Sequence, residues 1–311
     1  MEKLILSVSP HISGKRTTQS IMLDVIIALI PAAIASVVFF GIRSLLVICV
    51  CVATCMLSEF LFEKLCKREN TVLDLSSAVT GMILAFNLPV TIPLWQAIFG
   101  SVVAIIVVKQ LFGGIGQNFA NPAIAARIVM MTAFSGTMTA WVAPNAINKA
   151  VDALSTATPL VAESKGETPP SYLTLLLGTH AGCIGETCAA ALILGGLYLI
   201  LRGVISWHTP AAFIAVVAIM SFICGKDALY QVLSGGLLLG AFFMATDYST
   251  TPSTKWGKII FGIGCGLITI LIRFWGNLPE GVSFSILLMN ILTPYISKLT
   301  QNKPLVGEAK V

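Results

Sequence analysis

The sequence predicts an all-α polytopic membrane protein, with about ten transmembrane helices arranged as two inverted five-helix repeats. Of its 311 residues, 56% are hydrophobic and 11% are charged. The mean hydropathy of +0.91 lies far above that of an ordinary soluble domain. Apolar runs of membrane-spanning length recur along the whole chain, and a short pattern of residues repeats between its two halves.

Ten apolar segments are separated by polar breaks, and each is close to the ~20 residues that a helix needs to cross a bilayer. The predicted spans are 21–41, 44–63, 74–92, 94–112, 119–135, 186–202, 209–225, 228–247, 257–275 and 281–298. Backbone groups inside a membrane must be paired internally, and the alternating strands of a barrel are absent from the sequence. The spans are therefore expected to be helices. No small-residue cleavage site follows the first run, so we expect it to be retained.

One long interruption divides the chain. Residues 1–135 form the predicted N-terminal five-helix repeat, residues 136–185 a connecting loop, and residues 186–311 the C-terminal five-helix repeat. Because five is an odd number of crossings, the two halves would have opposite orientations in the membrane.

A weak internal repeat supports this division. Gly81, Thr91 and Pro93 recur 159 residues later as Gly240, Thr250 and Pro252, with both glycines in the third span of their halves. In inverted repeats, interrupted helices at corresponding positions mark a binding site near the bilayer midplane. Close helix packing is the commoner use of such glycines. Gly81 and Gly240 are therefore candidate residues for a ligand site between the halves.

The distribution of Lys and Arg predicts the orientation, because positively charged loops stay on the cytoplasmic side. With a cytoplasmic N-terminus, thirteen of the 19 basic residues fall on the inner side and Arg127 falls within a span. Only five fall on the outer side, namely Arg43, Lys149, Lys165, Lys226 and Arg273. We expect a bacterial inner-membrane protein with both termini cytoplasmic and loop 136–185 extracytoplasmic. The net charge of +5 then requires no nucleic-acid partner.

Few polar residues within the spans stand out. Arg127 and Asp247 are functional candidates because charged side chains at membrane depth are costly. The eight cysteines and three histidines lack the spacing of zinc or iron–sulfur ligands. We therefore predict no metal site and no catalytic side chain in this chain alone.

Asn121 and Pro122 have the chemistry of a helix start, with Asn as the N-cap and Pro at the first helical position. The glycine-rich turn 113–116 would deliver this helix start into the membrane. The positive end of the helix dipole at this start favours an anion or the polar edge of a ligand. A plain flexible loop explains the glycines equally well.

The predicted outer loop contains Asp152, Ser155, Ala157 and Thr158, followed by Pro159. A Ser/Thr cluster before proline is most often turn or helix-cap chemistry. The stretch also resembles the flavinylation motif Asp-x-x-Ser/Thr-Gly-Ala-Thr, with Thr156 replacing the glycine. That resemblance implies that FMN is attached to Thr158 through a phosphoester, which a separate flavin transferase makes. We expect Thr158 to be an exposed loop residue.

Further stretches carry a wider resemblance, and they lie at residues 9–12, 113–123, 182–187, 244–247 and 279–284. With the flavinylation motif, they resemble the family of Rnf complex D subunits and the related B subunits of Na⁺-translocating NADH:quinone reductases. This implies a flavin-carrying electron-transfer subunit of a redox-driven Na⁺ or H⁺ pump, the ferredoxin:NAD⁺ oxidoreductase, a translocase inactive without its partner Rnf subunits.

The resemblance also implies a second, non-covalent flavin such as riboflavin within the helices. We expect it near Gly81, Gly240, Asn121 and Asp247. One other class of function stays open, an inverted-repeat channel or secondary transporter without a redox role. The 152–158 segment discriminates between them, because a transporter has no need of an outward flavin site.

Overall fold

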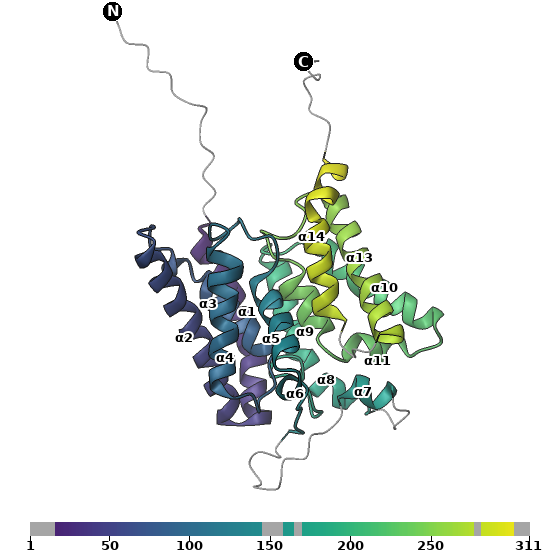
Figure 1. Cartoon of the computed structure of the whole chain (residues 1–311). Coiled ribbons are helices and arrows are strands. Elements are labelled where there is room, and N and C mark those ends of the chain that lie inside the picture. Colours follow the sequence, from purple (N-terminus) through teal and green to yellow (C-terminus); the bar gives the residue numbers. More distant parts are fainter. Residues whose placement is uncertain (1–15, 145–157, 165–169, 277–280, 302–311) are drawn as a thin grey trace, which may run out of the picture.

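The computed structural model describes residues 16–144, 158–164, 170–276 and 281–301, and these ranges contain helices but no strand (Figure 1). The predicted all-α class is confirmed. Four of the described helices are long and apolar enough to cross a membrane, and they are α1 Thr18–Phe40, α2 Ile42–Leu65, α13 Lys255–Trp275 and α14 Val282–Thr300. The other major helices are α3 Ser76–Phe86, α4 Leu94–Val102 with the π-helix η2 Val103–Gln110, α5 Pro122–Ala133, α9 Ala189–Leu201 and α10 His208–Ile223.

Every predicted span contains helix, while the number of spans that cross a membrane stays a prediction. The shorter elements are η1 Val72–Asp74, α6 Ser135–Met138, α7 Pro159–Ser164, α8 Tyr172–Leu177, α11 Ala228–Leu233, α12 Leu237–Leu239 and the π-helix η4 Gly240–Met244. The third span of each predicted half is interrupted. Helix α3 stops after 11 residues, and residues 234–236 separate α11 from α12.

The interruption after α3 leaves backbone carbonyls in the buried interior, where each needs a donor. The loop before α9 supplies them: Gly185 donates its N–H to Phe86 O at 2.9 Å, and Ile184 donates to Leu88 O at 3.0 Å. Only glycine fits at 185, because a Cβ there would lie 2.2 Å from Phe86 Cβ. The connecting loop thus completes the fold of the N-terminal half.

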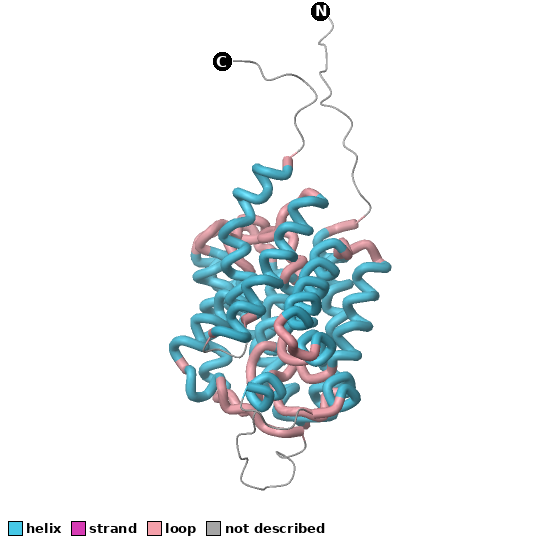
Figure 2. The backbone as a smooth tube through the Cα atoms, turned by 90° about the vertical axis from the view of Figure 1, so that its right-hand side faces the viewer, coloured by secondary structure: helices cyan, strands magenta, loops and turns pink. Residues whose placement is uncertain are grey.

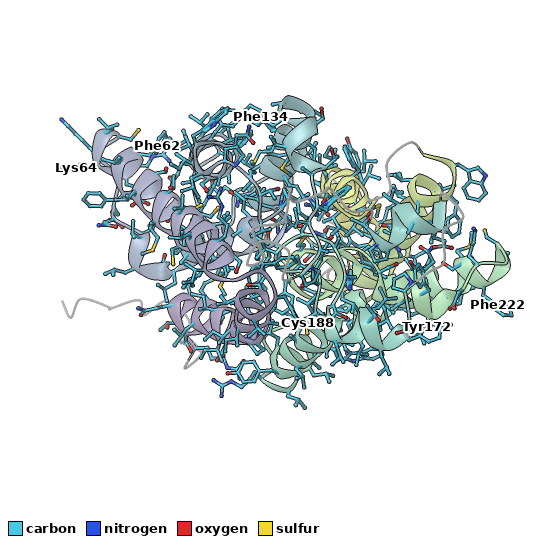
Figure 3. All side chains as sticks on the ribbon, turned by 90° about the horizontal axis from the view of Figure 1, so that it is seen from below. Phe62, Lys64, Phe134, Tyr172, Cys188 and Phe222 are labelled. Carbon is cyan, nitrogen blue, oxygen red and sulfur yellow. The ribbon has the colours of Figure 1, made fainter. Side chains whose placement is uncertain are left out.

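The two predicted halves lie side by side, with residues 16–133 on one side and α9 to α14 on the other (Figures 1 and 3). Helix α1 packs against α9, and α5 packs against α14. These are the first and fifth helices of their halves, so corresponding helices meet at the centre. An inverted repeat is expected to pair its helices in this way.

The described loops lie at the two ends of the bundle and, where helices are interrupted, within it (Figure 2). Helix α1 begins and α14 ends at one end, whereas α6, α7 and α8 lie at the opposite end (Figure 1). Large apolar side chains such as Ile34, Val38 and Leu65 are exposed on the outer surface, as expected for lipid-facing helices. Which end faces the cytoplasm stays a prediction.

Candidate functional site

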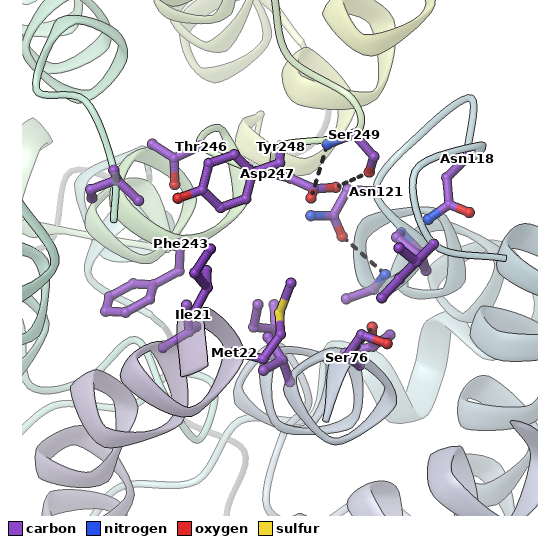
Figure 4. A pocket seen from close by; sticks show the side chains of 18 of the residues that line it. Ile21, Met22, Ser76, Asn118, Asn121, Phe243, Thr246, Asp247, Tyr248 and Ser249 are labelled. Carbon is purple, nitrogen blue, oxygen red and sulfur yellow. Dashed lines mark hydrogen bonds between the residues drawn. The ribbon is translucent and has the colours of Figure 1, made fainter. Parts of the chain in front are cut away.

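A cavity of about 440 Å³ lies between the two halves, at the end where α1 begins (Figure 4). Its volume is in the range of small-molecule sites, about 300–1,000 Å³. It is lined by the first turns of α1, one face of α3, the turn before α5 and residues 242–249. In Figure 4 the side chains of Met22, Asn121 and Asp247 surround the central space. The cavity can therefore hold a ligand that contacts both halves.

Asn121 lies at the start of α5, as the sequence predicts. Its Oδ1 accepts hydrogen bonds from Ala123 N at 3.1 Å and Ile124 N at 3.4 Å, and Pro122 occupies the first helical position. The side chain is 5% exposed and lines the cavity. The helix α5 thus begins at the wall of the cavity, with its positive dipole end nearby.

Asp247 also lines the cavity, in the segment after η4. Its Oδ2 accepts hydrogen bonds from Ser249 Oγ and Thr250 Oγ1, each at 3.1 Å. These hydroxyls supply hydrogen bonds that a buried carboxylate needs. The structure therefore brings Asn121 and Asp247 together at the wall of one cavity, where their side chains lie next to each other (Figure 4).

Gly81 and Gly240 do not line this cavity. A Cβ on Gly81 would lie 2.8 Å from Val52 Cα of α2, and a Cβ on Gly240 would lie 2.3 Å from Val282 Cγ1 of α14. Each glycine packs against a helix of its own half. The expectation that this pair joins the halves is wrong, because the closest helix contacts at these positions lie within each half.

The cavity wall includes a buried ion pair that the sequence analysis missed. Lys109 Nζ lies 2.5 Å from Glu59 Oε1 and donates to Ser76 Oγ at 2.7 Å. Gln110 Nε2 donates to the same Glu59 oxygen at 2.8 Å. Lys109 and Glu59 are 2% and 0% exposed. Lys109 is one of the thirteen basic residues that the sequence analysis assigned to the inner side, and the structure shows that it is buried rather than in an exposed loop. The sequence did contain a sign of this ion pair, because Lys109 lies inside the predicted span 94–112 and a charge there needs a partner.

Arg127 crosses the centre of the molecule, away from this cavity. Its side chain is 3% exposed and donates to Asn87 Oδ1 at 2.5 Å and to Ser283 Oγ at 3.1 Å. It also approaches Cys183 Sγ at 3.7 Å. Arg127 therefore connects α5, the end of α3, the connecting loop and α14, and this explains its place at membrane depth.

Thr158 immediately precedes α7, at the end of the bundle opposite the cavity (Figure 1). Its Oγ1 accepts a hydrogen bond from Val161 N at 3.4 Å, and its carbonyl accepts from Ala162 N at 2.9 Å. The residue is 6% exposed. The expectation of an exposed side chain is therefore wrong for the folded, unmodified chain. Asp152, Ser155 and Ala157 lie outside the described residues.

Helix α7 is held against the C-terminal half. Tyr230 Oη donates to Pro159 O at 2.8 Å, and Gln231 Nε2 donates to Glu163 Oε2 at 2.6 Å. Lys226 Nζ lies 3.6 Å from Glu163 Oε1. These contacts fix the segment that begins at Thr158 on the side of α11.

Helix α8 is tied to the same region. The hydroxyl of Tyr172 donates to Asp227, which also caps α11 by accepting from Leu229 N at 3.0 Å and Tyr230 N at 3.1 Å. The hydrogen bond from Tyr172 is the main reason that the pKa of Asp227 lies below its usual value. In the described ranges, no three His, Cys, Asp or Glu side chains gather in a metal-binding arrangement.

Together, the fold and the cavity define a helical membrane protein with a ligand-sized space between two halves. A model of the "NQR2, RnfD, RnfE family" matches residues 5–306. The D subunit of the Na⁺-translocating ferredoxin:NAD⁺ oxidoreductase complex of Acetobacterium woodii is 47% identical over 312 residues, with 99% of this chain and 96% of that protein covered. The chain therefore belongs to the NQR2, RnfD, RnfE family, and the resemblance seen in the sequence is confirmed.

Two further relatives extend this finding. The D subunit of the proton-translocating ferredoxin:NAD⁺ oxidoreductase complex of Clostridium ljungdahlii is 41% identical, with 95% of this chain and 94% of that protein covered. The D subunit of the ion-translocating oxidoreductase complex of Alcanivorax borkumensis is 35% identical, with 96% and 95% covered. The similarity thus extends from end to end rather than over one motif.

Proposed function

We propose that this chain is the membrane-embedded, flavin-carrying electron-transfer subunit of a redox-driven ion pump, the ferredoxin:NAD⁺ oxidoreductase complex. The observation that carries the proposal is the end-to-end similarity to relatives named as the D subunits of such complexes. Their names differ in the ion, Na⁺ in one and the proton in the other, so family membership does not choose between them. A channel or transporter without a redox role is disfavoured, because these relatives are named as oxidoreductase subunits.

The proposed place of this subunit is the bacterial inner membrane, in a hetero-oligomeric assembly with the other Rnf subunits. Both termini would face the cytoplasm, and the 136–185 loop would lie outside. The described helices support this arrangement in one respect, because α1 begins and α14 ends opposite α7 and α8 (Figure 1). A separate flavin transferase would then act on the outer segment.

Thr158 is the proposed attachment point for FMN. Its hydroxyl suits a phosphoester, which would leave the flavin ring free to exchange electrons as the chemistry that this cofactor supplies. In the unmodified chain the hydroxyl is largely covered and accepts a backbone hydrogen bond at the start of α7. We therefore expect the start of α7 to loosen when the transferase acts.

The cavity between the halves is the proposed site of a non-covalent flavin such as riboflavin. Its volume of about 440 Å³ and its mainly apolar wall with a few polar groups suit an aromatic ligand of that size. Asn118, Asn121 and Thr80 offer amide and hydroxyl groups to a polar ring edge, and Lys109, paired with Glu59, completes the polar part of the wall. The helices around it would exclude water from the ligand.

One experiment tests the flavin content of the chain. The purified complex is denatured in detergent, the subunits are separated by electrophoresis, and the released small molecules are analysed by chromatography. We expect flavin fluorescence in the band of this chain and free riboflavin in the released fraction. A dark band would contradict the proposed role of the chain as a covalent flavoprotein.

A further inference from the structure

A second cavity, of about 180 Å³, lies next to the first at the same end of the bundle. It is formed where α10 and α13 begin. Its polar wall residues are Ser206, Thr209, Thr246, Tyr248, Thr251, Ser253 and Lys258. No carboxylate belongs to the wall of this cavity as described. Its chemistry is therefore that of hydroxyl groups and one ammonium group.

The start of α10 lacks a cap. Trp207 occupies the N-cap position of this 16-residue helix, and no side chain bonds to its first N–H groups. These groups have no intrahelical partner and carry the positive end of the helix dipole. At α13, by contrast, Thr254 Oγ1 accepts a hydrogen bond from Gly257 N at 3.1 Å. The uncapped end of α10 is thus available to an anion.

Thr209 provides a second, independent observation. Its side chain is 2% exposed and lines the cavity, and its hydroxyl has no hydrogen-bond partner in the described part of the chain. A hydroxyl that lines a cavity and has no protein partner can donate a hydrogen bond to an acceptor inside that cavity. Lys258 lines the same space and makes no ion pair with any described residue.

The nearest acidic residue along the chain does not compete with an anion here. Asp247 lines the larger cavity, and its carboxylate accepts hydrogen bonds from Ser249 and Thr250 at 3.1 Å each. The hydroxyl of Tyr248 donates to Val204 O and thereby joins the two loops that border the smaller cavity. The hydroxyls of Thr246 and Thr251 likewise donate to the carbonyls of Phe242 and Asp247. These three hydroxyls are therefore not free to donate to a ligand, whereas Thr209 and Lys258 have no such partner in the described ranges.

We propose that this cavity binds the phosphate group of an anionic phospholipid. A phosphate offers several strong acceptors to the Thr209 hydroxyl, the Lys258 ammonium and the start of α10. The source is a lipid because Trp207 and Trp256, next to the two helix starts, are 59% and 73% exposed. Tryptophan concentrates at the level of the lipid headgroups, so the cavity opens where phospholipid phosphates lie.

The test uses the purified full-length chain in detergent and native mass spectrometry. Phosphatidylglycerol, phosphatidylcholine and inorganic phosphate are titrated separately. We expect the chain to retain phosphatidylglycerol in preference to phosphatidylcholine. Thr209→Val and Lys258→Gln should each weaken this binding about tenfold, as the loss of a hydrogen bond to a charged group implies. Thr209→Ser should retain binding, because it keeps the hydroxyl.

Lys255→Gln is the matched control, since Lys255 begins the same helix α13, is exposed and does not line the cavity. Its lipid binding should equal that of the unaltered chain. If Thr209→Val fails to fold, the half-buried Lys258 still provides the test. Unchanged phosphatidylglycerol binding in Lys258→Gln would overturn the proposed site. Inorganic phosphate binding as tightly as phosphatidylglycerol would overturn the assignment to a lipid.

Discussion

Replacing Lys109 by methionine removes one partner of the buried ion pair and leaves the Glu59 carboxylate inside the protein. The two charged groups lie 2.5 Å apart with side chains that are 2% and 0% exposed. At that separation, with an effective dielectric constant of about 20, their attraction is about 7 kcal/mol before the cost of desolvating the two charges. The stranded carboxylate keeps a hydrogen bond from Gln110 at 2.8 Å. We therefore expect Lys109→Met to lower the free energy of unfolding by about 3–5 kcal/mol.

A second substitution distinguishes lost charge compensation from lost packing. The double variant Lys109→Met with Glu59→Gln removes both charges of this pair, so it should recover most of the stability that Lys109→Met loses. Unfolding of the purified chain by denaturing detergent, followed by tryptophan fluorescence, measures both. Lys255→Met, on the surface, should change stability by less than about 0.5 kcal/mol. A double variant no more stable than Lys109→Met would refute the reasoning.

Two other predictions follow from the packing and the orientation of the chain. Gly81→Ala should destabilise the protein by about 1–3 kcal/mol, since its Cβ would lie 2.8 Å from the α2 backbone. Gly136→Ala, which meets nothing within 4 Å, is the control, and equal stabilities of the two variants in the same unfolding assay would contradict this packing. Reporter fusions at Ser164 and Lys310 should lie on opposite sides of the membrane, and fusions on the same side would disprove the proposed topology.

Most of the fold could be predicted from the sequence because the bilayer restricts the possible structures. Apolar length and the need to pair backbone groups identified the helical segments, and local chemistry located a helix start at Asn121. The interruption after α3 was harder to predict. It depends on Ile184 and Gly185, almost a hundred residues away, which donate hydrogen bonds to the carbonyls of Leu88 and Phe86.

The site was predicted only in part, for a related reason. Asn121 and Asp247 could be selected because each belongs to a recognisable local pattern, and both line the cavity. Lys109 and Glu59 lie 50 residues apart in the sequence, and each alone is typical of a helix end near the membrane surface. Only the packing of η2 against α2 shows that they neutralise each other. Gly81 carries no sequence signal that distinguishes contact with α2 from contact with the other half.

The central claim is that this chain carries its own flavin, and mass spectrometry of its peptides tests that claim most directly. We expect the mass of FMN on the peptide that contains Thr158, with fragments that place it on this residue. Thr158→Ala should lack covalent flavin in a folded chain, because loss of a cap at the start of α7 costs only about 0.5–2 kcal/mol. FMN located at Ser155 or Thr156, or flavin retained in Thr158→Ala, would contradict the account.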